Sequence, residues 1–131
     1  MNTSRLPAAV AGYIAATNGF DIDALMTTFA EDALVNDHRN EFVGRAAIRR
    51  WAEREIIGDR VTLRLTGAIV RDTSASITAV VDGRFDKTGL PDPLVLTFYF
   101  ALDGDRIDQL VIVHNAPVSQ TGSIEPSLGR S

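Results

Sequence analysis

The sequence predicts a single α+β domain in which three helices come first and a mostly antiparallel sheet follows. Apolar residues recur at helical spacing as far as residue 57, and from residue 60 the period changes to two. Glycine, proline and aspartate mark turns between the alternating segments. A helical layer on one face of a strongly curved sheet would form a cone with an apolar interior, so we expect a pocket.

The composition is that of an ordinary globular protein, and it excludes several classes of function. The chain has 131 residues and a net charge of −4, which does not favour a nucleic-acid surface. It has no cysteine, so disulfides and thiolate metal sites are excluded. No apolar run approaches the ~20 residues that span a bilayer, and the N-terminus lacks a signal-peptide pattern. We expect a cytoplasmic protein without membrane or nucleic-acid partners.

We expect one domain over residues 1–131, with a core at about 6–116 and a loosely ordered tail at about 117–131. The tail has little apolar content and several prolines and glycines. The first helix is predicted from four residues at helical spacing: Val10, Tyr13, Ile14 and Thr17. Gly19 is a typical helix stop.

A second helix is predicted over residues 21–29, with Asp21 as its N-cap. A turn at residues 31–32 and a short apolar strand over residues 33–37 follow, and this strand carries Asp37 into the protein. A polar loop is expected over residues 38–43. Gly44 then precedes a third helix over residues 45–57, which Gly58 ends.

Four long strands are predicted in the second half of the chain. Their alternating segments cover residues 61–69, 77–85, 94–102 and 106–114, with a hairpin signal at Asp103 and Gly104. The strand over residues 94–102 is apolar on both faces, so both faces should be covered. A second subunit on the outer face would explain this pattern, and ordinary core packing is the alternative.

Several segments resemble the nuclear transport factor 2-like superfamily, and most closely its SnoaL-like and ketosteroid isomerase-like branches. The matching segments are AAVAGYIAATNGFDIDALMTTFAEDALVNDH, FVGRAAIRRWAE and LTFYFALDGDRIDQL. The resemblance covers residues 6–116 and implies the cone-shaped, cystatin-like fold. It does not identify a reaction, because this fold supports isomerases, dehydratases, cyclases and binding modules.

The resemblance implies three candidate catalytic residues. Asp37 matches the general base of the isomerases, and Tyr13 matches the tyrosine that hydrogen-bonds the developing enolate. His114 ends the last strand, where the family often has an aromatic lining residue, and it is a candidate second acid or base. An Asp among apolar side chains loses hydration, which makes its carboxylate a better proton acceptor. The candidate substrate-binding residues are Ile14, Phe29, Trp51, Phe98, Phe100 and Ile112.

The sequence also departs from the isomerases. These enzymes have a protonated Asp on the penultimate strand, and the matching position here is Phe98, with Thr97 and Tyr99 as neighbours. Phe29 stands where some isomerases have a supporting tyrosine. The chain therefore has two of the three catalytic groups.

Each candidate residue has a structural alternative. Tyr13 is also explained as a core residue, and Asp37 as a loop cap that accepts from the amides of Arg39 or Asn40. His38 follows Asp37 directly, so in an extended strand it would point the other way and belong to an exposed loop. His114 is also explained as a rim histidine without a catalytic role.

The expected function is that of a cofactor-independent isomerase or cyclase acting on a small hydrophobic carbonyl compound, with a homodimer formed through the sheet face. The alternative is a non-catalytic, dimeric small-molecule-binding module, and a pure interaction domain ranks third. No ligand spacing supports a metal site. The acidic set of an epoxide hydrolase is not recognisable among Asp82, Asp86 and Asp108. The identity of the ligand stays open.

Overall fold

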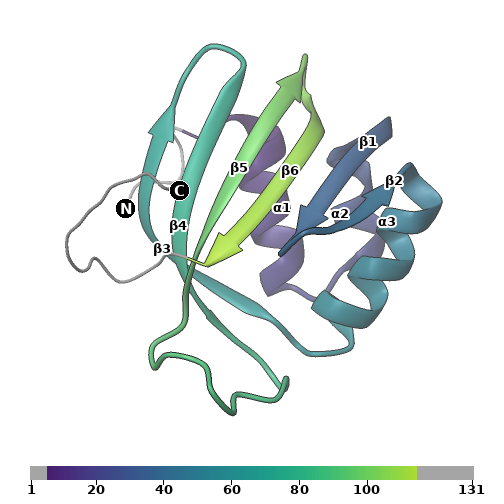
Figure 1. Ribbon diagram of the computed structural model, residues 1–131. Coiled ribbons are helices and arrows are strands. Elements are labelled where there is room, and N and C mark those ends of the chain that lie inside the picture. Colours follow the sequence, from purple (N-terminus) through teal and green to yellow (C-terminus); the bar gives the residue numbers. More distant parts are fainter. Residues whose placement is uncertain (1–5, 115–131) are drawn as a thin grey trace.

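The computed structural model describes residues 6–114, which form a six-stranded sheet with helices packed against it. The strand order is β2-β1-β6-β5-β4-β3. β1 is parallel to β6, and the other neighbours are antiparallel. Figure 1 shows α1 and α2 behind the strands and α3 beside β1 and β2. The predicted α+β class and the mostly antiparallel, curved sheet are confirmed.

Helix α1 (Ala8–Asn18) forms the back wall of the interior, and its buried face is the predicted one. The four residues that predicted this helix, Val10, Tyr13, Ile14 and Thr17, are all buried. At its end Asn18 exchanges two hydrogen bonds with the backbone of Leu63, at 3.1 and 2.7 Å. These bonds fix the end of α1 to β3 (Thr62–Val70), so Tyr13 and Thr17 face the interior.

Helix α2 (Ile22–Thr27) has the predicted N-cap, because the Asp21 carboxylate accepts from the amide of Ala24 at 3.1 Å. The helix ends earlier than predicted. The hydroxyls of Thr27 and Thr28 bond back to carbonyls three residues earlier, which competes with continued helix. Phe29, predicted as the last helical residue, instead begins β1.

The segment after α2 differs most from the prediction. β1 (Phe29–Asp37) runs through the predicted turn at Glu31 and Asp32, and an irregularity in its pairing with β6 absorbs these two exposed residues. The predicted loop over residues 38–43 is wrong as well. It is a two-residue turn followed by β2 (Asn40–Val43), which pairs with β1.

The third helical segment has the predicted extent but two geometries. α3 (Arg45–Ala52) continues as the π-helical segment η2 (Glu53–Ile57). Gly44 precedes α3 with φ +85°, a conformation that a residue with a side chain rarely adopts. Trp51, 2% exposed, lies in the last turn of α3 and faces the interior. Single-turn π segments often occur at functional sites.

The remaining strands are β4 (Ser74–Asp82), β5 (Val95–Asp103) and β6 (Arg106–His114). The last strand has the predicted bounds. The strand predicted to reach Phe85 stops at Asp82, because the Asp82 carboxylate accepts from the amide of Gly83 and the chain turns into a loop over residues 83–94.

The two faces of β5 differ in exposure. Leu96, Phe98 and Phe100 are buried against the helices, whereas Tyr99 on the outer face is 51% exposed. On the outer face Thr97 is buried and Val95 and Ala101 are partly buried, so the exposed part of this face centres on Tyr99. No helix among residues 6–114 has the length and apolar character needed to cross a membrane. The predicted tail at 117–131 lies outside the described residues.

Candidate active site

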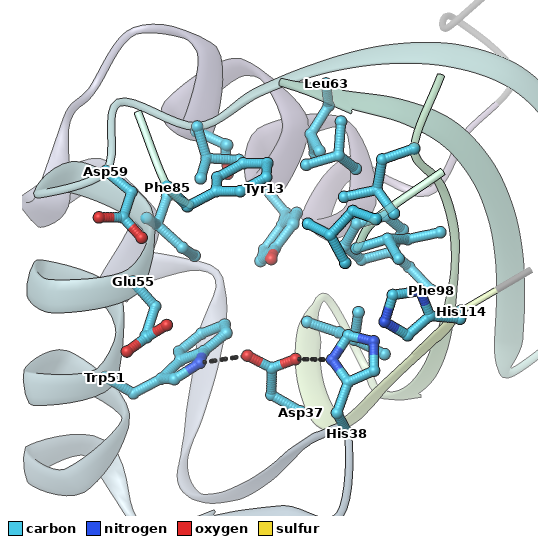
Figure 2. A pocket seen from close by; sticks show the side chains of 18 residues that line it. Tyr13, Asp37, His38, Trp51, Glu55, Asp59, Leu63, Phe85, Phe98 and His114 are labelled. Carbon is cyan, nitrogen blue, oxygen red and sulfur yellow. Dashed lines mark hydrogen bonds and ion pairs between the residues drawn. The ribbon is translucent and has the colours of Figure 1, made fainter. Parts of the chain in front are cut away.

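A cavity of about 250 Å³ opens between α1, the end of β1, α3 with η2, and the inner face of β3 to β6. At about 30 Å³ per water molecule this space corresponds to roughly eight waters, which suits a small ring compound. Its lining is mostly apolar (Figure 2). Six of the predicted site residues line it: Tyr13, Asp37, Trp51, Phe98, Ile112 and His114.

Two side chains hold Asp37 at the cavity wall. The indole Nε1 of Trp51 donates to Asp37 Oδ2 at 3.0 Å, and Nδ1 of His38 lies 2.7 Å from Asp37 Oδ1. The side chain of Asp37 is 24% exposed. An ionised carboxylate has about four lone-pair sites, so each oxygen keeps acceptor capacity toward the cavity. This arrangement fixes the carboxylate and leaves it free to accept a proton.

Tyr13 lies across the cavity from Asp37, and Figure 2 shows its hydroxyl directed into the open space. Its ring packs edge-to-face on Phe100 and Phe29, with centroid distances of 5.4 and 6.2 Å, and touches Phe98. Burial raises the pKa of Tyr13 above the usual value of a phenol, and the negative charge of Asp37 raises it further. The hydroxyl therefore stays protonated and can act as a hydrogen-bond donor.

Three predicted substrate-binding residues do not line the cavity. Ile14, Phe29 and Phe100 are buried in the core, at 9%, 0% and 1% exposure. Phe29 lies at the start of β1 and Phe100 near the far end of β5, so both pack against the flank of Tyr13. Their role in this structure is to hold the Tyr13 ring in place.

The predicted orientation of His38 is wrong. His38 and Arg39 both have positive φ, +51° and +76°, so the strand alternation ends at Asp37 and the imidazole turns toward the carboxylate. The alternative role of Asp37, as a cap of the loop that follows it, is not seen either. The amide of Arg39 donates to the side chain of Asn36 at 2.9 Å instead.

His114, at the end of β6, lies beside His38 at the cavity rim. The two ring centroids are 4.3 Å apart. Burial lowers the pKa of His114, the nearby His38 lowers it further, and the charge of Asp37 opposes both effects. Figure 2 shows both imidazoles on the same side of Asp37.

Other lining residues were not predicted. Glu55 and Asp59 place two more carboxylates at the wall across from the histidines (Figure 2). Thr17 lies one helical turn after Tyr13, a spacing that could have identified it. Phe85 and Leu90 come from the loop over residues 83–94, whose path no local pattern predicts. Among residues 6–114 no group of three or more metal-ligating side chains could hold a metal ion.

Helices packed on a curved, mostly antiparallel sheet around a cavity define the nuclear transport factor 2-like class. The model of the SnoaL-like domain matches residues 10–110, and the chain belongs to this family. No curated protein matches this sequence.

Solved structures agree with this assignment. A Sinorhizobium meliloti protein classed as a polyketide cyclase is 32% identical, with a TM-score of 0.77, over 86% of this chain and 100% of that one. A Catenulispora acidiphila protein with a ketosteroid isomerase-like fold, in complex with trimethylamine, is 26% identical, with a TM-score of 0.69, over 82% and 85%.

A third structure, of a Kribbella flavida protein classed as a ketosteroid isomerase, is 17% identical, with a TM-score of 0.69. It covers 95% of this chain and 83% of that one. At this identity the match shows the fold alone.

Proposed function

We propose that this chain is a cofactor-independent enzyme that moves a proton next to the carbonyl group of a small hydrophobic compound, as an isomerase or a cyclase. One observation carries the proposal. The Asp37 carboxylate, held by Trp51 and His38, and the protonated phenol of Tyr13 meet across a mostly apolar cavity. A base and an oxyanion donor on opposite sides of one space are what enolate chemistry needs.

The reaction follows from these two groups. Asp37 takes the proton from the carbon next to the carbonyl, and the electron pair of that C–H bond moves into the carbonyl to form an enolate. The enolate oxygen accepts a hydrogen bond from Tyr13. In an isomerisation Asp37 returns the proton to another carbon. In an aldol cyclisation the enolate carbon attacks a second carbonyl, and the new alkoxide takes the proton from Asp37.

Two further observations bear on the choice between these reactions. The Sinorhizobium meliloti relative is classed as a polyketide cyclase, which supports the cyclisation. Phe98 lines the cavity where the isomerases have a second acid, and Thr97 and Tyr99 alternate to the other face of β5. Tyr13 would thus be the main hydrogen-bond donor to the enolate oxygen, with His114 as a candidate second acid or base at the rim.

The test is the exchange of α-protons with solvent, since it does not require the natural substrate. The wild-type chain is incubated in D₂O with 2-tetralone, a small bicyclic ketone, and the loss of the α-proton signals is followed by NMR. We expect exchange well above the rate in buffer and with an unrelated protein. Binding of the ketone without faster exchange would overturn the enzyme proposal and leave the non-catalytic binding module.

The charges of the lining lead to a prediction about the ligand. Among the described residues the cavity wall carries Asp37, Glu55 and Asp59 but no lysine or arginine. A carboxylate ligand would therefore meet like charges, so we expect the tetralin-2-carboxylate anion to bind at least about tenfold more weakly than 2-tetralone. The chain has a single tryptophan, and the NMR signal of the Trp51 indole N–H, at the cavity wall, reports binding.

The double variant Glu55→Gln, Asp59→Asn is the matched control. It removes two of the three negative charges at the cavity wall and should reduce the difference in affinity between 2-tetralone and the tetralin-2-carboxylate anion. Equal or tighter binding of the anion by the wild-type chain would contradict the expected charge preference.

We further propose a homodimer through the outer face of the sheet. Tyr99 on β5 and Val113 on β6 are 51% and 36% exposed, and they lie on the face opposite Phe98 and Ile112. Exposed apolar side chains gathered on one face are typical of an interaction surface.

Sedimentation velocity tests the dimer. The wild-type chain should sediment with twice its 14.2 kDa mass, and Tyr99→Lys should shift it to the monomer. Val43→Lys is the control, since Val43 is exposed on β2 at an edge of the sheet. A monomeric wild-type chain would contradict the proposal.

A further inference from the structure

The turn between β1 and β2 holds His38 in an unusual place. Asp37 pairs with Asn40, so the turn has only two residues, and both have left-handed backbone. Such turns strongly favour asparagine and glycine, because most other residues are strained at positive φ. His38 and Arg39 occupy these positions instead. Strained turns of this kind persist where the surrounding structure holds them, and they gather at functional sites.

Two hydrogen bonds donated by backbone amides stabilise this turn. The amide of His38 donates to the carbonyl of Ile112 at 3.2 Å, and the amide of Arg39 donates to Asn36 Oδ1 at 2.9 Å. The first bond ties the turn to β6, two residues before His114. The imidazole is thereby fixed between Asp37 and the end of β6.

The contacts of the His38 ring define its chemical role. Nδ1 lies 2.7 Å from Asp37 Oδ1, whereas Nε2 is buried and has no hydrogen-bond partner in the described part of the chain. The ring of His114 packs beside it, with 4.3 Å between centroids. His38 lines the cavity wall, but its Nε2 is buried, and the one hydrogen-bonding contact of the ring among the described residues is with Asp37.

A neutral histidine has one protonated ring nitrogen and one acceptor nitrogen. An ionised Asp37 only accepts, so a proton on Nδ1 satisfies both groups of the pair. A proton on Nε2 would instead leave two lone pairs facing each other across 2.7 Å.

Charged and titratable groups surround the two rings both inside the cavity and beside it, where Arg39, Glu41 and Arg54 line a neighbouring hollow with Asp37. Asp37 lies beside His38, and Glu55, Asp59 and Tyr13 line the walls across from it. Burial and the neighbouring His38 lower the pKa of His114 and the charge of Asp37 opposes them, and the net lowering favours a neutral His114 ring beside His38 near pH 7.

We propose that His38 is a positioning residue that donates from Nδ1 to the carboxylate of Asp37, while His114 shields Nε2 of His38 from water. With the Trp51 indole on Oδ2, this bond holds both oxygens of Asp37 and turns their free lone pairs toward the ligand. The role in catalysis rests on the proposed function. The hydrogen bond and the ring tautomer do not depend on the proposed function, so they are tested separately.

The first experiment is a long-range ¹H–¹⁵N NMR spectrum of the histidine rings, which distinguishes protonated from unprotonated nitrogens without any substrate. The chain contains only two histidines, so His38→Asn and His114→Ala each remove one set of signals and assign both. We expect His38 to carry its proton on Nδ1 at pH 7. In His114→Ala water reaches Nε2, and the ring should shift toward the other tautomer.

An Nε2-protonated His38 in the wild-type chain, or the tautomer mixture of a free histidine, would overturn the inference. An unchanged His38 tautomer in His114→Ala would overturn the shielding role of His114. Either result is independent of whether the chain turns over a ketone.

The second experiment compares His38→Asn with His38→Leu in the 2-tetralone exchange assay. Asparagine places its amide near the position of Nδ1 and tolerates positive φ, so it can keep both the donor and the turn. Leucine removes the donor. We expect a loss of about 10- to 100-fold for His38→Leu and a rate within about threefold of wild type for His38→Asn.

Equal rates in both variants would overturn the positioning role. Failure of the proposed function looks different, because the wild-type chain itself would then show no exchange while the ring spectrum still reports the Asp37–His38 bond.

Discussion

Asp37→Asn is expected to slow the exchange of the 2-tetralone α-protons by about 100- to 10,000-fold, the usual contribution of a general base. The amide has nearly the same shape as the carboxylate, and its oxygen can still accept from Trp51. The substitution thus removes the proton acceptor while it keeps the cavity. NMR of the ketone in D₂O measures the rate, and the indole N–H signal of Trp51 checks that the site remains folded.

The matched control for this variant is Asp82→Asn. Asp82 is exposed, lies at the end of β4 and pairs with Lys87 at 3.4 Å, outside the cavity. Its exchange rate should equal that of the wild-type chain. If Asp37→Asn kept its rate within about threefold of wild type, Asp37 would not be the base.

Tyr13→Phe is expected to lower the same exchange rate by about 100- to 1,000-fold, as removal of one oxyanion donor does in other enzymes. The ring stays packed among Phe29, Phe98 and Phe100, so the loss comes from the hydroxyl. Because the pKa of Tyr13 is raised, the hydroxyl is protonated at neutral and alkaline pH alike. The loss in rate should therefore be the same from pH 6 to pH 9.

The second tyrosine of the chain provides the control. Tyr99 is exposed on the outer face of β5, so Tyr99→Phe removes a hydroxyl that does not face the cavity. Its rate should equal that of wild type. A similar loss in both variants would mean that the effect is structural, and no loss in Tyr13→Phe would exclude its role as the oxyanion donor.

Much of the fold could be predicted because its signals are local. The spacing of Val10, Tyr13, Ile14 and Thr17 predicted the buried face of α1, and the period of two in the second half predicted β3 to β6. Asp21 was recognised as an N-cap from its type and position alone. These predictions succeeded because side-chain periodicity follows directly from backbone geometry.

The bounds near the site were harder to predict. α2 ends early because two threonine hydroxyls bond to its carbonyls, and β4 stops where Asp82 caps the next turn. Such side-chain bonds differ by only small free energies from the backbone hydrogen bonds of a longer helix or strand, so residue type alone does not determine which of them form.

The sequence by itself determined the α+β fold, the inner faces of the helices and strands, and the candidate pair Tyr13 and Asp37. Only the tertiary structure decided how Asp37 is held. The left-handed turn at His38 and Arg39 contains no glycine and gives no local signal, and its bonds come from Asn36 on β1 and Ile112 on β6. Trp51 reaches Asp37 from α3, 14 residues later. The bonds from Trp51 and Ile112 join segments that are distant in sequence and form only when the whole domain packs. His38 is the sequence neighbour of Asp37, and only the left-handed backbone of the turn, which no local pattern predicted, directs its ring toward the carboxylate.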